Sequence, residues 1–278
     1  MMSLRVKECF TREVQKKESD LNLAYAALLM AEYLTGPFDT GLCLSTLDEM
    51  AEMIEPALHR AESDEAMIKA LNRCFFKELK FSGNIKHYYH PHNSYLNKVL
   101  ELRLGIPISL SVVYLEVGWR LGLPLWGINL PGHFIVGYGP ETEAIYIDVF
   151  AEGRLLSELD CLSLTQGRIA SPQQLKTRYL KPTPKKRILL RMLLNLKQIY
   201  VNLEDWESGY RVVDLMLTVE PGQTNEYRDR GLMAYRLNQL RAASQDIERY
   251  LFLTPQSPDA GWLKQHLETI EERLLRLN

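Results

Sequence analysis

The chain has 278 residues, 46% of them hydrophobic and 24% charged, which is the composition of a soluble globular protein with one large or two ordinary domains. Its 33 Lys and Arg residues nearly balance 35 Asp and Glu residues, and the formal net charge of −2 argues against wholesale binding to nucleic acid or to an anionic membrane. No apolar run approaches the roughly 18–20 residues that a membrane-spanning helix needs.

The N-terminus and the cysteines indicate a cytoplasmic protein. Residues 1–17 mix both charge signs and lack the apolar stretch of a signal peptide. Cys9, Cys43, Cys74 and Cys161 are scattered and show no CxxC spacing. They predict reduced cysteines with mainly a packing role, rather than a disulfide framework or a zinc site.

A first domain is predicted over residues 1–175, with a helical subregion from about 18 to 80. Apolar residues recur at helical spacing from Leu21 to Leu29, and Gly36-Pro37 ends this first helix. Further helices are expected over residues 46–60 and 63–78. The second of these has Ser63 at the N-cap, a position that favours serine.

The core of this domain, about residues 81–160, is predicted to combine helices with an antiparallel sheet. One helix is expected over residues 93–104, where Asn93 or Ser94 suits the N-cap. A second helix begins at Pro107, a favoured first-turn residue, and ends at Gly122-Leu123-Pro124. A strand over residues 125–130 and a hairpin follow, so the order of elements predicts an α+β fold.

The hairpin joins two β-rich runs, residues 133–138 and 143–150, through the turn-forming residues 139–142. With this four-residue loop, His133 and Asp148 face each other directly, with Cβ atoms about 4.5–5.5 Å apart. A carboxylate at that distance accepts a hydrogen bond from an imidazole, fixing its tautomer and raising its basicity. The same pair also fits a purely structural hydrogen bond.

Ser109 lies in the first turn of the helix that starts at Pro107, where the positive end of the helix dipole stabilises an oxyanion or a thiolate. The order Ser109, His133, Asp148 permits a nucleophile–base–orienter triad, but serine needs a well-aligned base. The other interpretation is that Ser109 caps or packs the first helical turn. Asn93 lines the same site if its helix crosses near His133.

A histidine-rich segment, His87-Tyr88-Tyr89-His90-Pro91-His92, precedes these helices. Histidines at such spacings bind zinc, nickel or copper in some proteins. No acidic or cysteine ligand accompanies them in the sequence, so histidines at the surface or at a pocket rim are the other interpretation. We therefore predict binding roles for His90, His92, Asn93 and Tyr95, and we expect no metal or other cofactor.

Residues 176–187 carry six cations and two prolines, and we interpret them as a basic linker between two domains. A contact site for nucleic acid or for an acidic partner is the alternative, and no other segment is a candidate for one. The residues that follow, 188–278, are predicted to form an all-helical domain that ends with a helix over residues 259–276.

This second domain carries a repeat. Pro221 and Pro255 are 34 residues apart, which is the period of the tetratricopeptide repeat. Gly231 and Ala243 are 12 residues apart and occupy the two small-residue positions at which the paired helices touch. The sequence therefore predicts a tail of helical repeats of the tetratricopeptide type.

Several segments together resemble the bacterial SirB-type family, whose members have a transglutaminase-like, papain-like α+β core followed by tetratricopeptide repeats. The segments are Asn93-Ser94-Tyr95-Leu96, Gly105-Ile106-Pro107-Ile108-Ser109-Leu110-Ser111, Leu121-Gly122-Leu123-Pro124, Pro131-Gly132-His133-Phe134 and Tyr146-Ile147-Asp148. The resemblance covers nearly the whole chain, and related transglutaminase-like modules occur in some eukaryotic F-box proteins.

The resemblance implies that a catalytic Cys would start the central helix, with a His and an Asp on the two strands that follow. His133 and Asp148 match the latter two residues. The Cys position falls at Pro107, or at Ser109 with a small gap, so the thiol is absent. A serine does not supply the thiolate that a transglutaminase or a cysteine protease requires.

We therefore predict a non-catalytic, regulatory protein that binds a protein or peptide through its core groove and its helical repeats. The alternative is a serine-dependent hydrolase or acyltransferase that uses Ser109, His133 and Asp148. A third hypothesis is nucleic-acid regulation through residues 176–187. No membrane partner is expected.

Overall fold

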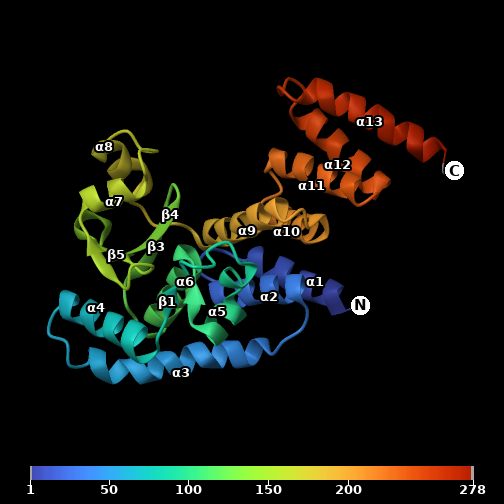
Figure 1. The fold of residues 1–278 in the computed structure, drawn as a ribbon. Helices are drawn as coiled ribbons and strands as arrows, with labels where there is room; N and C mark the ends of the chain where they lie inside the picture. Colours follow the sequence, from blue (N-terminus) through green and yellow to red (C-terminus); the bar gives the residue numbers. More distant parts are fainter. Residues whose placement is uncertain (1, 277–278) are drawn as a thin grey trace. The chain divides into compact units, whose positions relative to one another are not determined.

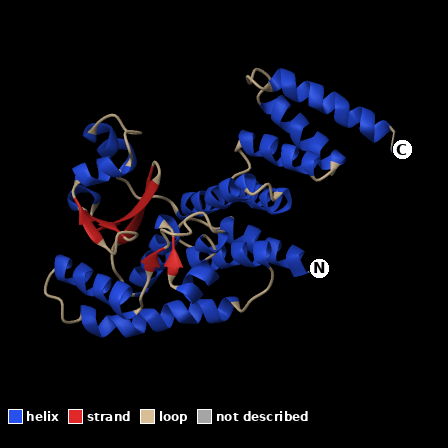
Figure 2. Cartoon of the chain, in the orientation of Figure 1, coloured by secondary structure: helices blue, strands red, loops and turns tan. Residues whose placement is uncertain are grey.

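The computed structural model describes residues 2–276, and the chain divides into two compact units, residues 1–192 and 193–278 (Figure 1). The first unit combines helices with small β-sheets, whereas the described part of the second unit is helical (Figure 2). The predicted α+β fold with a helical tail is therefore confirmed. No helix among residues 2–276 is long and apolar enough to cross a lipid bilayer.

The first unit contains short and long helices around two small sheets. Its helices are α1 (Met2–Val14), α2 (Leu23–Thr35), α3 (Thr40–Leu58), α4 (Asp64–Asn72), α5 (Leu96–Leu102), α6 (Pro107–Arg120), α7 (Glu158–Leu164) and α8 (Pro172–Gln174), with π-helical turns over Arg73–Glu78 and Leu175–Tyr179 and 3-10 turns over Pro91–Asn93 and Glu141–Glu143. Its strands are β1 (Ser82–Gly83), β2 (Leu104–Gly105), β3 (Leu125–Leu130), β4 (His133–Tyr138), β5 (Ile145–Asp148) and β6 (Arg154–Leu156).

Helix α6 is the centre of the first unit. Twelve of its fourteen residues are buried, because α2, α3, α5, β3 and β4 all contact it. A helix enclosed on all sides needs apolar residues around its whole circumference, and α6 supplies them from Ile108 to Val117. The burial of this surface is a major stabilising contribution to the unit.

A buried carboxylate on α6 connects it to two other helices. Glu116 is 5% exposed, and its Oε1 accepts a hydrogen bond of 2.8 Å from the backbone N–H of Ala24 in the first turn of α2. Its Oε2 accepts from Arg120, which also donates to Asp48 on α3, each at 2.6 Å. Since a carboxylate is stabilised at the positive end of a helix, Glu116 fixes the start of α2 against α6.

The larger sheet is antiparallel, in the order β3-β4-β5-β6. In β4 and β5, Val136 pairs with Ile147, so the register differs by two residues from the predicted one, in which His133 faces Asp148 directly. The predicted four-residue loop is wrong, because Glu141–Glu143 forms a 3-10 turn and the loop extends over residues 139–144. A shift of two residues leaves each side chain on its predicted face of the sheet.

Helices cover both faces of this sheet (Figure 1). Helix α6 packs on one face, where a Cβ atom on its Gly118 would collide with Leu125. On the other face, Ile128, Ile135 and Tyr146 form a cluster with Cys161 of α7 and with residues near α8. Because side chains alternate along a strand, His133 and Asp148 belong by register to this second face, away from α6.

The structure corrects several predicted element boundaries. Helix α1 and the two-residue parallel pair β1–β2 were not predicted. The helix expected from residue 93 begins at Leu96, so the N-cap is Tyr95 rather than Asn93 or Ser94. The N-cap at Ser63 is confirmed, since its Oγ accepts a hydrogen bond from the backbone of Ala66.

The basic segment, residues 176–187, lies in the first unit, and part of its charge is engaged there. Lys176 forms an ion pair of 2.9 Å with Glu158. The Nζ of Lys185 donates to the carbonyl of Leu21 and lies 5.4 Å from the ring of Trp119. These contacts reduce the cationic surface that a nucleic acid could meet, and the role of the segment as a linker stays a prediction.

The second unit consists of antiparallel helix pairs. Its helices are α9 (Lys185–Asn202), which begins in the first unit, α10 (Trp206–Val219), α11 (Thr224–Arg236), α12 (Leu240–Leu253) and α13 (Ala260–Leu275). A Cβ atom on Gly231 of α11 would lie 3.0 Å from Ile247 and 3.3 Å from the carbonyl oxygen of Ala243 on α12. The close approach of these helices at the two predicted small residues is therefore confirmed.

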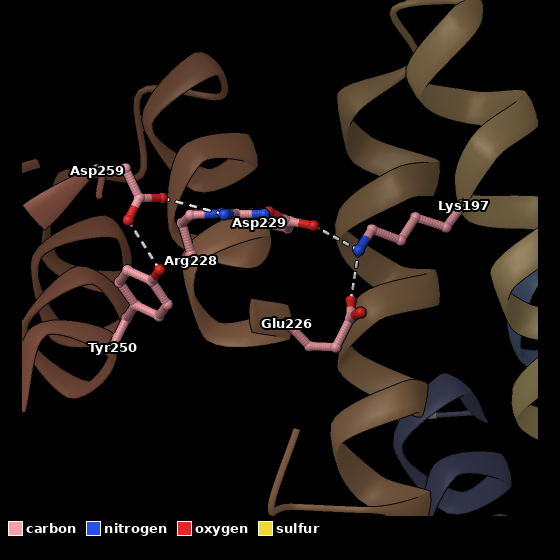
Figure 3. A network of polar contacts seen from close by, with 6 residues as sticks. All are labelled: Lys197, Glu226, Arg228, Asp229, Tyr250 and Asp259. Carbon is pink, nitrogen blue, oxygen red and sulfur yellow. Dashed lines mark hydrogen bonds and ion pairs between the residues drawn. The ribbon is translucent and has the colours of Figure 1, made fainter. Parts of the chain in front are cut away.

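A network of ion pairs and hydrogen bonds joins α9, α11 and α12 of the second unit to Asp259, the residue before α13. Figure 3 shows six of its residues, Lys197, Glu226, Arg228, Asp229, Tyr250 and Asp259. Lys197 on α9 binds both Glu226 and Asp229 on α11, and its side chain is only 12% exposed. Arg228 extends the network to Asp259 before α13. Removing one member of such a partly buried network is costly, because it leaves the other charges without partners.

Replacing Gly231 with Val should destabilise the second unit by about 1–3 kcal/mol, because the added side chain forces α11 and α12 apart. The measurement is urea unfolding of the full chain followed by circular dichroism. Gly261→Val is the matched control, since no atom lies within 4 Å of a Cβ placed on Gly261. Equal unfolding midpoints for the two variants would contradict the close approach of α11 and α12.

Candidate functional site

His133 and Asp148 form a hydrogen-bonded pair at one end of β4 and β5, the two central strands of the larger sheet. The Nε2 of His133 lies 3.0 Å from Oδ1 of Asp148, and the two side chains are 13% and 6% exposed. In the observed register Asp148 is a diagonal neighbour of His133 on the same face, and long side chains bridge that separation. The predicted pairing of these residues is confirmed, although the register behind the prediction is not.

The carboxylate of Asp148 is also held by the backbone. Its Oδ1 accepts hydrogen bonds from the N–H groups of Phe150, at 3.0 Å, and Ala151, at 3.3 Å. These two donors belong to the turn that follows β5, so the turn fixes the carboxylate and the carboxylate fixes the ring of His133. This is the orienting part of a base–orienter pair.

An aromatic contact connects His133 to the histidine-rich segment. The Phe150 ring lies 6.3 Å from the His133 ring and 6.0 Å from the Tyr88 ring. Phe150 also fills the space beside Gly83 in β1, where a Cβ atom would lie 2.5 Å from its ring. The β1–β2 pair, only two residues long, therefore positions one side of the site, and no periodicity in the sequence indicated it.

Ser109 is completely buried, and its hydroxyl bonds to the backbone. Its Oγ accepts a hydrogen bond of 3.1 Å from the N–H of Ile106 and donates one of 2.5 Å to the carbonyl of Asn93. Gly105 is required beside it, because a Cβ atom there would lie 2.7 Å from the hydroxyl. The interpretation of Ser109 as a residue that caps the first turn of α6 is confirmed.

The structure does not join the three residues of the predicted triad. Between residues 2 and 276, no hydrogen bond links Ser109 to His133. By register, His133 and Asp148 lie on the face of the sheet opposite α6, the helix that carries Ser109. The Ser109 hydroxyl is therefore bonded to the backbone of Ile106 and Asn93, and not to His133.

Cys161 is the cysteine on the same face of the sheet as Asp148. It is completely buried in the cluster under α7. Burial, followed by the charges of Asp160 and Asp148, raises the pKa of its thiol to about 12. The thiol is protonated at neutral pH and does not replace the missing thiolate nucleophile.

Two of the predicted binding residues are buried and hold the backbone. Asn93 donates from Nδ2 to the carbonyls of His87, at 2.7 Å, and Tyr88, at 3.0 Å. Its Oδ1 accepts from Asn84, so Asn93 fixes the histidine-rich segment rather than facing solvent. Tyr95 is 2% exposed and belongs to the core, which does not fit its predicted binding role.

The other two, His90 and His92, are exposed and lie next to each other. Their ring centroids are 4.5 Å apart, and the Nδ1 of His90 accepts a hydrogen bond from the N–H of His92. Partial burial, followed by the neighbouring His90, lowers the pKa of His92. Across residues 2–276, no group of three or more His, Cys, Asp or Glu side chains has the arrangement of a metal site.

The second unit contains an aromatic cavity that the sequence did not indicate. This repeat groove has a volume of about 470 Å³ and is lined by residues of α9, α10, α11 and α13, among them Trp206, Asp229, Tyr235, Arg236, Trp262 and His266. Trp262 is 48% exposed. The tryptophans come from helices far apart in the chain, so only the packed repeats bring them together.

Comparisons with known families identify both parts of the chain. Residues 42–194 match the transglutaminase-like superfamily, and residues 196–268 match the tetratricopeptide repeat. The predicted transglutaminase-like core and repeats are confirmed, and their boundary lies close to the division between the two compact units.

Similar proteins occur in bacteria and in animals. The chain is 34% identical over 253 residues to a UPF0162 protein of Xylella fastidiosa strain Temecula1, covering 90% of both chains. A UPF0162 protein of Vibrio cholerae is 30% identical over 226 residues, or 80% of this chain and 83% of the relative. F-box only protein 21 of Mus musculus is 32% identical over 174 residues, which are 58% of this chain and 27% of that protein.

Ser109→Ala should lower the free energy of unfolding by about 1–3 kcal/mol, because the buried N–H of Ile106 loses its acceptor. Ser111→Ala is the matched control, since the Ser111 hydroxyl is also completely buried but has no hydrogen-bond partner in the described chain. Its removal should be neutral or stabilising. Urea unfolding of both variants measures the difference, and equal destabilisation would contradict the capping role of Ser109.

Proposed function

Because the chain belongs to the transglutaminase-like superfamily and to the UPF0162 proteins, we propose that it is a non-catalytic protein-interaction module of the SirB type, acting in the cytoplasm. The tetratricopeptide repeats support protein interaction. The observation that carries the proposal is the repeat groove, an aromatic cavity with an exposed tryptophan on the repeat unit. The occupant we propose is a peptide segment of a partner protein.

The absence of catalysis is supported by the position of Ser109. To act as a nucleophile, a serine gives its proton to a base as it attacks. The proton of Ser109 is already donated to the carbonyl of Asn93 in a completely buried site. The geometry therefore gives no support to the alternative hydrolase or acyltransferase that uses Ser109, His133 and Asp148.

The repeat groove favours a peptide with both apolar and acidic residues. Arg236 lies 5.6 Å from the ring of Trp206, and Trp262 packs against His266 with ring centroids 4.0 Å apart. The charge of Lys197 in the groove is neutralised by its two carboxylate partners, whereas Arg236 forms no ion pair with any described residue. A partner carboxylate beside an apolar side chain complements this surface.

The test begins with the selection of peptides from a displayed random library on the full chain. A selected peptide is then titrated calorimetrically into the wild type and into Trp262→Ala. Loss of the tryptophan should weaken binding at least about tenfold, because exposed aromatic anchors dominate such interfaces.

Phe252→Ala is the control for this experiment, since Phe252 is 77% exposed and does not line the repeat groove. It should bind the selected peptide as tightly as the wild type. The proposal fails if no peptide is selected, or if Trp262→Ala and Phe252→Ala bind equally well.

A further inference from the structure

Two arginines approach the end of the β3–β4 hairpin, next to His133. Arg168 lies after α7, and its guanidinium covers Gly132, where a Cβ atom would collide with Nη1 and lie 3.2 Å from Cζ. The backbone of Gly132 has φ +84°, so both its conformation and its neighbour require glycine. The hairpin turn therefore places one guanidinium against the residue that precedes His133 in the chain.

Arg191 lies on α9, in the part of that helix that belongs to the first unit. It follows Ile188 by one helical turn, and Ile188 packs against Gly127 of β3, where a Cβ atom would lie 3.1 Å from its Cδ1. Thr183, just before α9, also bonds to β3, because its N–H donates to the carbonyl of Gly127 and its Oγ1 accepts from Asn129. These contacts fix the start of α9, and with it Arg191, against the sheet.

Neither arginine has an anionic partner. Among the described residues, Arg168 and Arg191 form no ion pair, and the Nε of Arg191 is buried without a hydrogen-bond acceptor. Burial lowers the pKa of Arg191, and the positive charge of Arg168 lowers it further. The interaction with Tyr88 raises it. Two neighbouring cations, one of them partly buried, cost free energy unless an anion compensates them.

Among the described residues, Asp148 forms an ion pair with neither arginine. The Oδ1 of Asp148 is occupied by His133 and by two backbone N–H groups of the following turn. Tyr88, which contacts Phe150, instead adds a hydrogen-bond donor: burial raises the pKa of its hydroxyl, so the group is protonated at neutral pH. The region thus offers donors and positive charge from three separate elements.

We propose that Arg168 and Arg191 form a binding site for an oxyanion, the phosphate or carboxylate group of a ligand, with Tyr88 as a further donor. A planar guanidinium donates paired hydrogen bonds to both kinds of group. The site belongs to the first unit and is independent of the repeat groove. It gives the transglutaminase-like core a ligand of its own, next to the retained His133–Asp148 pair.

The experiment is calorimetric titration of the full chain at constant ionic strength with inorganic phosphate and, separately, with N-acetylglycine. N-acetylglycinamide, which lacks the carboxylate, is the neutral control ligand. At least one anion should bind saturably, and Arg168→Gln and Arg191→Gln should each weaken that binding at least about tenfold. Arg12→Gln is the matched control, because Arg12 is exposed and lies far along the chain on α1.

Each outcome decides the proposal. Binding of phosphate alone assigns a phosphate group, binding of N-acetylglycine alone assigns a carboxylate, and binding of both assigns a general oxyanion site.

Without ligand, both variants should melt at or above the wild-type temperature, because the repulsion between the charges of Arg168 and Arg191 has been removed. Arg168 is exposed, so its variant remains a test if Arg191→Gln does not fold. The proposal is overturned if neither anion binds saturably, or if both variants bind like the wild type.

Discussion

The burial of α6 on all sides is the constraint on which the first unit depends. A helix start that is removed from water must satisfy its free N–H groups within the protein. Here the hydroxyl of Ser109 does so for Ile106 and also fixes the backbone of Asn93. A catalytic helix of this superfamily would instead have to present a reactive group at this point. The backbone hydrogen bonds of Ser109 stabilise this helix start, and they are the basis of the proposal that Ser109 is not a nucleophile.

His133 and Asp148 could be paired from the sequence because the pairing depends on the face of the sheet more than on the register. The 3-10 turn over Glu141–Glu143 lengthens the hairpin loop and shifts the register by two residues. An error of two residues keeps a side chain on its face, whereas an error of one would have separated the pair. Gly231 and Ala243 were predictable for a similar reason, since a repeat period fixes where paired helices touch.

Features assembled from distant segments could not be predicted. Arg168, Arg191 and Tyr88 come from three elements, and no local spacing relates them. The same holds for the tryptophans of the repeat groove. The predicted binding roles of Asn93 and Tyr95 rested on a motif next to a helix start. Such a motif does not show which of its side chains face solvent. Both are buried, and Asn93 holds the backbone of the histidine-rich segment.

The claim that Ser109 is structural and not a nucleophile is tested most directly by chemical labelling. The full chain is incubated with a serine-directed fluorophosphonate, and its intact mass is measured beside that of Ser109→Ala. A hydroxyl that is completely buried and bonded to the backbone should not react, so both proteins should keep their original mass. A single adduct that maps to Ser109 and disappears in Ser109→Ala would contradict the claim and restore the Ser109–His133–Asp148 hydrolase.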